Sequence, residues 1–338
     1  MPVTGGAQIT PERIMQFVWG YVPPLILEAA IRHRVFDVLD SGPKTVDEVH
    51  KETSASVRGL TAIMNALVGL DFLAKDRQDR YSLTPESAAF LVSTKPAFQG
   101  GLLRHVSEQL IPNWLHLNEV VATGEPVRSV NQQGNGSEFF KQFVNDIFPM
   151  SYPAAQVLAR HLNAGGGRTV RVLDLAAGSG VWGIALAQSS EHIRVTAVDW
   201  PDVIPVTRGT VGRFGLANRF SFVEGDLLKA DFGSDYDIAT LGHILHSEGR
   251  EHSRALLAKT FGALASGGTI AIAEFLVNAD RKGPVNGLFF AVNMLVNTDN
   301  GDTYSFEEIG GWLAEAGFTD ARTIDSPGPS PLILATKP

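Results

Sequence analysis

From residue 168 to the end of the chain, short apolar runs alternate with stretches in which apolar residues recur every three or four positions. The runs are "TVRVLDLAAG", "IRVTAVD", "RFSFVEGD", "YDIATLG", "TIAIAEF" and "PLILATK". Strands that alternate with helices predict a parallel sheet with helices on both faces. Nearly continuous apolar strands fit a sheet that is buried on both sides. We therefore expect an α/β domain in this part of the chain.

The first of these strands runs into a glycine-rich turn, "VLDLAAGSGVWGIALAQ". Gly178, Gly180 and Gly183 form a G-x-G-x-x-G pattern that follows a strand and opens a helix. In open α/β sheets, ligands bind at the carboxyl ends of the strands, so a ligand is expected at this turn. Asp199 ends the next strand, where an acidic side chain can accept hydrogen bonds from ribose hydroxyls.

Two classes of cofactor suit such a turn, a dinucleotide and S-adenosylmethionine. Asp174 lies four residues before Gly178, where it would face the phosphates of a dinucleotide at an energetic cost but would suit a cationic amino-acid group. Asp226, preceded by Gly225, ends the third strand and is placed to accept a hydrogen bond from an adenine amino group. The chain also closes on a hairpin-like segment, and together these features favour S-adenosylmethionine.

Residues 10–95 have helical periodicity and end in two short apolar runs joined by a charged turn. Thr10 followed by Pro11 is typical of a helix start, and helices followed by a two-stranded wing form a winged helix-turn-helix. The helix that would read DNA, "SASVRGLTAIMNALVGL", carries a single basic residue, Arg58. Groove-reading helices present several polar and basic side chains, so we expect this helix to be buried. A DNA-binding regulator that senses the cofactor stays as the alternative from another class.

Composition excludes several classes of function. The net charge of −8 disfavours a nucleic-acid surface. The chain contains no cysteine, which removes disulfides, thiolate nucleophiles and cysteine metal sites. The N-terminus lacks a basic start followed by an apolar core, and no run of about 18 apolar residues is seen. We expect a cytoplasmic protein with neither a membrane nor a nucleic-acid partner.

The D-x-A-x-G-x-G turn, Asp199, "GDLL", "ILH" and "LLAKTFGALASGGTIAIAEF" together resemble the small-molecule O-methyltransferases, both the plant caffeate/flavonoid type and the bacterial antibiotic or pigment type. The resemblance covers nearly the whole chain. It implies a mainly helical, winged-helix dimerisation domain followed by a Rossmann-like, seven-stranded class I methyltransferase domain whose last strand is antiparallel. It also implies a homodimer of secondary metabolism that transfers a methyl group from S-adenosylmethionine to a hydroxyl of an aromatic or polyketide-like small molecule.

The domain boundaries expected from these patterns divide the 338 residues into three parts. Residues 1–98 would form the dimerisation domain, residues 99–165 a helical connection that contributes to the substrate pocket, and residues 166–338 the cofactor-binding domain.

By the same resemblance, His246 of "ILH" is the catalytic base and Glu274 of "AEF" orients it, without a metal. A phenol has a pKa near 10 and is a poor nucleophile at neutral pH until its proton is removed. Histidine, with an ordinary pKa near 6.5, can remove it.

The chain departs from the family pattern at three positions. The family's second orienting glutamate falls nearest Thr303, where the neighbouring Asp302 could substitute with a shorter side chain. Ser247 replaces an aspartate and Gly242 replaces a lysine. These departures leave open a carbon or nitrogen methyl acceptor, or a reaction without methyl transfer.

The remaining expected contacts follow from the resemblance and from local composition. Trp200 and Leu227 would enclose the adenine, with Asp226 at its amino group. The cofactor residues are Asp174, Gly178, Gly180, Asp199, Trp200, Gly225, Asp226 and Leu227. The acceptor residues, for which core packing is the alternative, are Trp114, Phe143, Met150, His243, Phe289, Phe290, Asn293 and Met294.

His243 and His246 are also spaced as metal ligands can be. Glu248, Glu251 and His252 lie nearby, but the turn from strand to helix would disperse these side chains. No metal site is expected.

Overall fold

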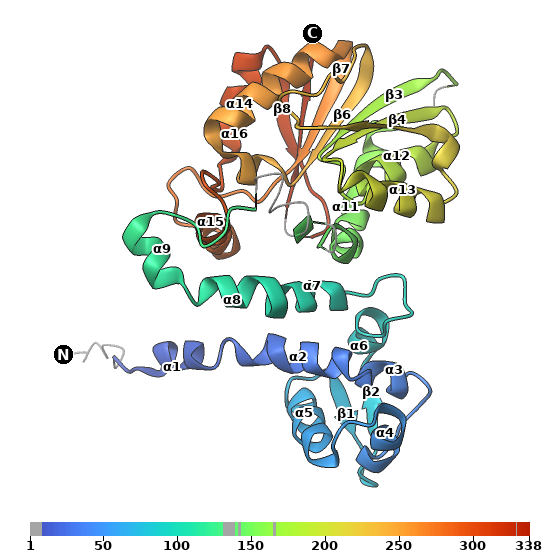
Figure 1. The fold of residues 1–338 in the computed structure, drawn as a ribbon, viewed down its shortest axis with the longest axis vertical. Coiled ribbons are helices and arrows are strands. Elements are labelled where there is room, and N and C mark those ends of the chain that lie inside the picture. Colours follow the sequence, from blue (N-terminus) through green and yellow to red (C-terminus); the bar gives the residue numbers. More distant parts are fainter. Residues whose placement is uncertain (1–8, 131–138, 141–142, 165–166, 329) are drawn as a thin grey trace, which may run out of the picture. The chain divides into compact units, whose positions relative to one another are not determined.

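The computed structural model describes residues 9–130, 139–140, 143–164, 167–328 and 330–338. It divides into two compact units, Met1–Leu110 and Ile111–Pro338 (Figure 1). The second unit therefore includes much of the region that the sequence analysis treats as a connection.

The N-terminal unit is mainly helical and contains one small antiparallel hairpin. α4 begins with a capping box, in which Thr45 and Glu48 satisfy each other's backbone amides. The elements are α1 (Glu12–Val18), α2 (Val22–Arg32), α3 (Val35–Leu39), α4 (Val46–Thr53), α5 (Val57–Gly69), β1 (Leu73–Lys75), β2 (Tyr81–Leu83), α6 (Pro85–Phe90), α7 (Gly100–His105) and the π-helical turn η1 (Val106–Leu110).

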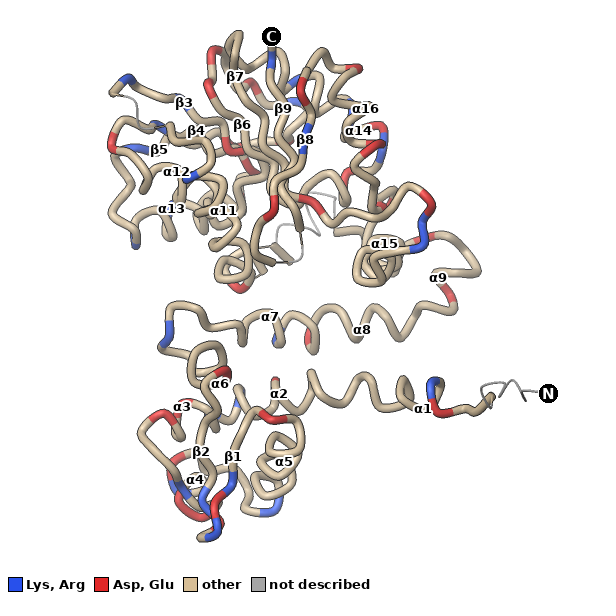
Figure 2. Tube along the Cα trace, turned by 180° about the vertical axis from the view of Figure 1, so that it is seen from behind, with Lys and Arg blue, Asp and Glu red and all other residues tan. Residues whose placement is uncertain are grey.

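The core of this unit confirms the predicted burial of the apolar helix. Leu60, Met64 and Leu67 of α5 are all buried in one cluster with Phe36 and Tyr81. Around the β1–β2 hairpin, basic and acidic residues are intermixed along the chain (Figure 2). Neither feature provides the basic reading face that a DNA-binding winged helix needs.

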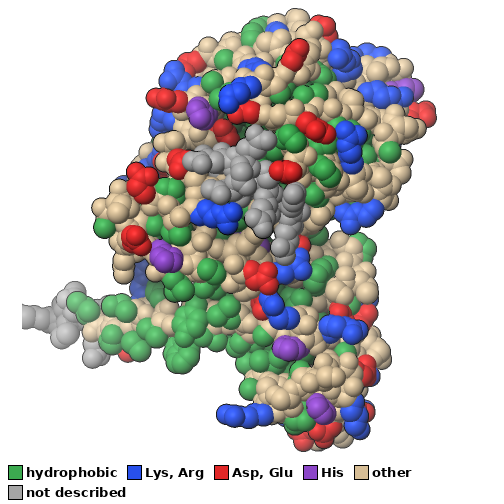
Figure 3. Space-filling view, viewed as in Figure 1, with side chains coloured by type: hydrophobic (Ala, Val, Ile, Leu, Met, Phe, Trp, Pro, Cys, Tyr) green, Lys and Arg blue, Asp and Glu red, His purple; other side chains and the backbone are tan. Residues whose placement is uncertain are grey.

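By length and composition alone, one helical stretch of the described residues, Glu12–Arg32, could cross a membrane. The sequence pattern alone does not predict such a stretch. It is broken between α1 and α2, and little of it is buried within the chain. Apolar side chains therefore gather on the surface of α1 (Figure 3).

The second unit is built around a seven-stranded sheet. Its helices are α8 (Ile111–Trp114), α9 (Leu117–Thr123), α11 (Phe148–Leu162), α12 (Val181–Ser189), α13 (Ile204–Arg213), η2 (Ala217–Arg219), α14 (Leu245–Ala263), α15 (Val285–Asn297) and α16 (Phe306–Ala316). Its strands are β3 (Val170–Leu175), β4 (Ile193–Asp199), β5 (Phe220–Glu224), β6 (Tyr236–Gly242), β7 (Leu264–Ala273), β8 (Thr319–Ile324) and β9 (Leu332–Thr336).

The strand order is β5-β4-β3-β6-β7-β9-β8. The strands from β5 to β7 are parallel, and β9 pairs antiparallel with both β7 and β8. This confirms the seven-stranded sheet with an antiparallel last strand. The order reverses at β3, whose neighbours are β4 and β6, so the glycine-rich turn lies at the point where such sheets bind ligands.

Candidate active site

The residues that the sequence predicts to be catalytic follow the carboxyl ends of β6 and β7. These strands are parallel neighbours, and Gly242 pairs with Ala273 at their last position. The residues that follow, His243 on one side and Glu274 on the other, therefore emerge next to each other. His246 then lies in the first turn of α14.

His246 and Glu274 form a buried pair. Oε1 of Glu274 lies 2.6 Å from Nδ1 of His246, and Oε2 accepts the backbone amide of His246 at 3.2 Å. Glu274 is fully buried and His246 is 8% exposed. Burial would raise the pKa of Glu274, but the charge and hydrogen bond of His246 outweigh it and hold this pKa below its usual value. Glu274 is therefore an ionised acceptor that directs the Nδ1 proton.

Asp302 contacts His246 differently from the expected way. Its backbone amide donates to the carbonyl of His246 at 2.9 Å. Its carboxylate accepts the amide of Thr303 at 2.7 Å and lies 3.9 Å from Arg281. The side chain therefore does not stand in for a second orienting glutamate, because it is held by its own neighbour and by an arginine.

His243 faces the loop before β9. Its Nε2 lies 2.9 Å from the hydroxyl of Ser330, and its backbone adopts φ 59°. Burial lowers the pKa of His243 to about 4, so its ring is neutral at physiological pH. Among the residues that the structure describes, no three His, Asp or Glu side chains group as metal ligands.

An aromatic wall lies beside His246. The ring of Phe290 on α15 lies edge-to-face to the imidazole of His246, with the ring centroids 4.8 Å apart. The same ring stacks on Phe275, with the centroids 4.0 Å apart. Phe289 is 57% exposed, whereas Met294 is buried at 5%. Phe290 thus brings an aromatic ring of α15 against the imidazole.

Two more of the residues expected to bind the methyl acceptor are hydrogen-bonded to each other. Nε1 of Trp114 on α8 donates to Oδ1 of Asn293 on α15 at 3.0 Å. Phe143 packs against Phe139 and Phe140, and Met150 lies half-buried in α11.

The glycine-rich turn is held by the end of the next strand. Oδ2 of Asp199 accepts the amide of Gly178 at 2.8 Å, and Oδ1 accepts the amide of Trp200 at 2.7 Å. Gly178 and Gly180 have φ values of 54° and 78°, which favour glycine. Burial raises the pKa of Asp199 to about 6, although both backbone hydrogen bonds oppose the rise. Trp200 keeps its ring half-buried, edge-on to Phe140.

The direct cofactor contact expected of Asp174 stays a prediction, and in the structure this residue supports the turn from beneath. It is fully buried, with Oδ2 accepting the amide of Gly183 at 3.0 Å and Oδ1 the hydroxyl of Thr240 at 2.6 Å. Burial raises its pKa to about 7. Thr240 was not flagged in the sequence because its place beside Asp174 depends on the pairing of β3 with β6.

The loop after β5 contains the last group of cofactor residues. Gly225 donates its amide to the carbonyl of Asp199 at 2.9 Å, which joins the ends of β4 and β5. Oδ1 of Asp226 accepts the amide of Leu228 at 2.8 Å, and Leu227 packs against the core. Nζ of Lys259, which the sequence analysis did not single out, donates to the carbonyl of Leu227 at 2.9 Å.

Trp182 explains why glycine stands at position 242. A Cβ on Gly242 would lie 1.8 Å from Nε1 of Trp182, so the indole occupies the space that any side chain there would need. Trp182 is buried, and its ring lies 6.3 Å from that of His243.

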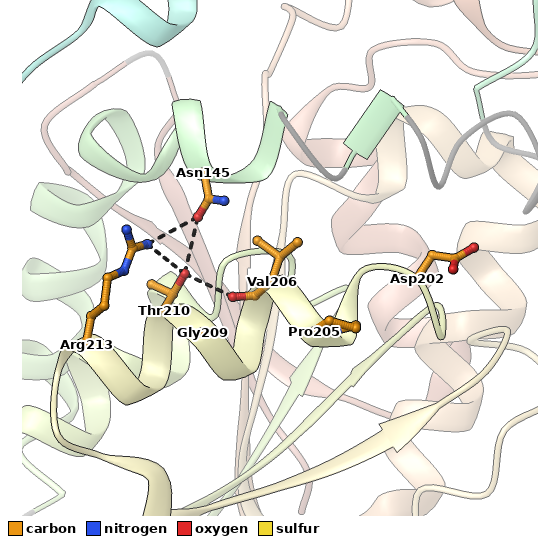
Figure 4. Close-up of a pocket in the computed structure, with 7 residues that line it drawn as sticks. All are labelled: Asn145, Asp202, Pro205, Val206, Gly209, Thr210 and Arg213. Carbon is orange, nitrogen blue, oxygen red and sulfur yellow. Dashed lines mark hydrogen bonds between the residues drawn. The ribbon is translucent and has the colours of Figure 1, made fainter.

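A separate surface depression of about 630 Å³ lies over α13 (Figure 4). Arg213 donates there to Thr210 at 3.0 Å and to Asn145 at 3.3 Å. None of the residues that line the depression belongs to the expected site. The hydrogen bond between Arg213 and Asn145 joins α13 to the segment before α11.

Comparisons with known proteins agree with the fold and identify its family. An O-methyltransferase domain model matches residues 151–319, and an O-methyltransferase dimerisation domain model matches residues 15–93. The 3-hydroxy-5-methyl-1-naphthoate 3-O-methyltransferase of Streptomyces sahachiroi is 31% identical over 336 residues, covering 97% of this chain and 95% of the relative. The tetracenomycin polyketide synthesis 8-O-methyl transferase TcmO of Streptomyces glaucescens is 28% identical, covering 97% of each chain.

A solved structure also matches. PigF, an S-adenosyl-L-methionine-dependent methyl transferase of a Serratia strain, has been solved with SAH; it superimposes with a TM-score of 0.86 at 25% identity, covering 98% of this chain and 100% of PigF. The chain therefore belongs to the O-methyltransferase family with an N-terminal dimerisation domain, and it is an S-adenosylmethionine-dependent O-methyltransferase that acts on small molecules.

Proposed function

We propose that His246 is the general base that removes the proton of the acceptor hydroxyl, in a reaction that needs no metal. The observation that carries this proposal is the buried hydrogen bond of 2.6 Å between Nδ1 of His246 and Glu274. With the proton fixed on Nδ1, the lone pair stays on Nε2. Nε2 has no hydrogen-bond partner among the described residues, so it is free to accept a proton.

The residues around the glycine-rich turn suit the cofactor. Left-handed glycines bring the turn's backbone close to a ligand, and Asp199 keeps oxygen lone pairs for ribose hydroxyls while it holds Gly178 and Trp200. Trp200, Asp226 and Leu227 are the residues that we expect around the adenine. When bound, S-adenosylmethionine supplies an electrophilic methyl group on a cationic sulfur.

The acceptor is proposed to be a flat aromatic or polyketide-like phenol. Phe275 and Phe290 form a stacked apolar wall beside the imidazole, as pockets for planar ligands commonly do. The neutral ring of His243 adds a hydrogen-bonding group beside that wall. The remaining catalytic effect would come from aligning the deprotonated oxygen with the methyl group.

Replacing the proposed base tests this assignment. We expect His246→Ala to lower kcat by about 100-fold or more and to leave S-adenosylmethionine binding unchanged by calorimetry. His252→Ala is the matched control, because this histidine lies exposed on the same helix. Unimpaired turnover by His246→Ala would refute the base role.

The acceptor itself requires a separate experiment. A panel of phenols incubated with methyl-labelled S-adenosylmethionine and read by mass spectrometry identifies the substrate, and product NMR identifies the methylated atom. A methyl group on carbon or nitrogen would overturn the hydroxyl assignment.

We also propose that the protein is a homodimer in which the apolar surface of α1 is covered by the second copy. Large apolar side chains there are exposed in the single chain, and exposed apolar surface of this extent indicates an interface. They are Ile14, Met15, Phe17, Val18, Trp19 and Tyr21.

The dimer is tested by sedimentation at micromolar concentration. We expect the unmodified protein to sediment as a dimer and the double variant Phe17→Ser/Trp19→Ser to sediment as a monomer. A monomeric unmodified protein would contradict the proposal. The cytoplasmic location stays a prediction from the sequence.

A further inference from the structure

We infer that Arg281 is a positioning residue for His246, and that it acts through residues 298–303, which we name the strap. This inference rests on the proposed role of His246 as the base. It assigns a function to a guanidinium in the loop between β7 and α15, away from the imidazole itself.

The strap lies directly against the turn that carries the base. The amide of Asp302 donates to the carbonyl of His246 at 2.9 Å, and the amide of Gly301 donates to the hydroxyl of Thr298 at 2.9 Å. A Cβ on Gly301 would lie 2.5 Å from the carbonyl oxygen of His246. A displacement of the strap would therefore move the backbone of His246.

Arg281 fixes the far side of the strap. Its Nη1 donates to the carbonyl of Thr303 and lies 3.9 Å from Oδ2 of Asp302. Its Nη2 donates to Oε2 of Glu308 on α16 at 2.8 Å. Glu308 is itself held by Arg250 of α14 at 2.7 Å. The guanidinium thus ties the strap to the two helices that pack beside it.

The arrangement compensates for the missing second glutamate. Thr303 stands nearest that position, and its hydroxyl donates to the carbonyl of Gly287 at 3.2 Å, not to the imidazole. The ring of His246 is then oriented by Glu274, while its backbone is held by the strap. Proton transfer and methyl transfer both become slower when the reacting groups are displaced by a small distance. A loosened strap would displace His246 and should therefore slow the chemical step.

The test compares Arg281→Met with Arg254→Met. Arg254 forms an ion pair of 2.7 Å with Glu315 and likewise joins α14 to α16, but among the described residues no hydrogen bond or ion pair links it to the strap. We expect Arg281→Met to lower kcat about 10-fold, with the acceptor KM and the cofactor Kd within about twofold. Arg254→Met should leave all three unchanged, and Arg281→Lys should recover part of the lost rate.

A double variant separates positioning from general destabilisation. In a His246→Ala background, Arg281→Met should cause no further loss, because residues that act as one unit are non-additive. Gly301→Ala, which displaces the strap without removing a charge, should lower kcat as Arg281→Met does.

Two outcomes overturn the inference. One is an unchanged kcat in Arg281→Met, and the other is a loss of kcat from Arg281→Met that is equal in the unmodified protein and in the His246→Ala background. Neither touches the base role, which fails only if His246→Ala itself retains full turnover.

Discussion

At the scale of single residues, the charge of Glu274 decides which nitrogen of His246 can act. Glu274→Gln keeps the size of the side chain but offers an amide that can donate to Nδ1, which would place the ring proton on Nε2. We expect kcat to fall by about 100-fold, with cofactor affinity unchanged. Steady-state kinetics with calorimetry checks this, and a kcat within about twofold of the unmodified enzyme would contradict it.

Trp182 and Gly242 form a coupled pair whose substitution effects should not add. A side chain on Gly242 collides with the indole 1.8 Å away, and overpacking of this kind costs about 1–3 kcal/mol. Gly242→Ala should therefore lower the free energy of unfolding by about that amount. Trp182→Phe combined with Gly242→Ala should lose less than the sum of the single variants. Urea unfolding measures all three, and additive losses would refute the coupling.

The residues that the sequence could predict are those that follow directly from strand order. His246 and Glu274 come after neighbouring parallel strands, so their meeting follows from the fold. Trp182 and Ser330 could not be found in this way, because their contacts depend on how a helix and a loop pack over the strand ends. For Asp302 the sequence suggested the side chain, but it is the backbone amide that contacts His246.

At the scale of elements, one lysine of α14 holds the loop that follows β5. Nζ of Lys259 donates to the carbonyls of Leu227 and Ala230 at 2.9 and 2.5 Å, and it lies 4.0 Å from the ring of Phe232. Burial lowers the pKa of Lys259, although the charges of Asp226 and Asp231 oppose the fall. This loop contains the proposed adenine contacts, Asp226 and Leu227.

Loosening that loop should weaken cofactor binding selectively. We expect Lys259→Met to raise the Kd for S-adenosylmethionine about 10-fold, which corresponds to the loss of one charged hydrogen bond, while kcat at saturating cofactor is kept. Lys229→Met is the control. Lys229 is exposed, and its Nζ forms an ion pair of 3.5 Å with Asp226 on the surface of the same loop. Equal affinities for the Lys259 and Lys229 variants would contradict the role of Lys259.

The elements themselves were largely predictable, because each buried strand carries a continuous apolar run. The six runs identified in the sequence correspond to six strands of the sheet. The remaining strand, β8, lies at the sheet edge and has exposed and half-buried positions but no buried one, and a short polar edge strand gives little apolar signal.

At the scale of the whole molecule, the second unit places two carboxyl groups at its glycine-rich turn, where Asp174 is fully buried and Asp199 is half-buried. The pKa of Asp174 rises to about 7 and that of Asp199 to about 6, both mainly through burial. A folded-state pKa above the unfolded value means that the folded protein binds the proton more tightly. The contribution of Asp174 to stability is therefore complete below about pH 4 and is lost as the pH rises to about 7.

Asp174→Asn isolates this effect, because it removes the titrating group and leaves the other carboxylates in place. Between about pH 5 and about pH 8, the unmodified protein should lose about 2 to 3 kcal/mol of unfolding free energy relative to the variant. Urea unfolding of the cofactor-free protein at both pH values measures the difference. The Asn side chain forfeits one of the two hydrogen bonds that Asp174 accepts, but this loss is the same at both pH values and cancels. A difference that stays constant with pH would show that Asp174 is already charged at the lower pH, despite its full burial.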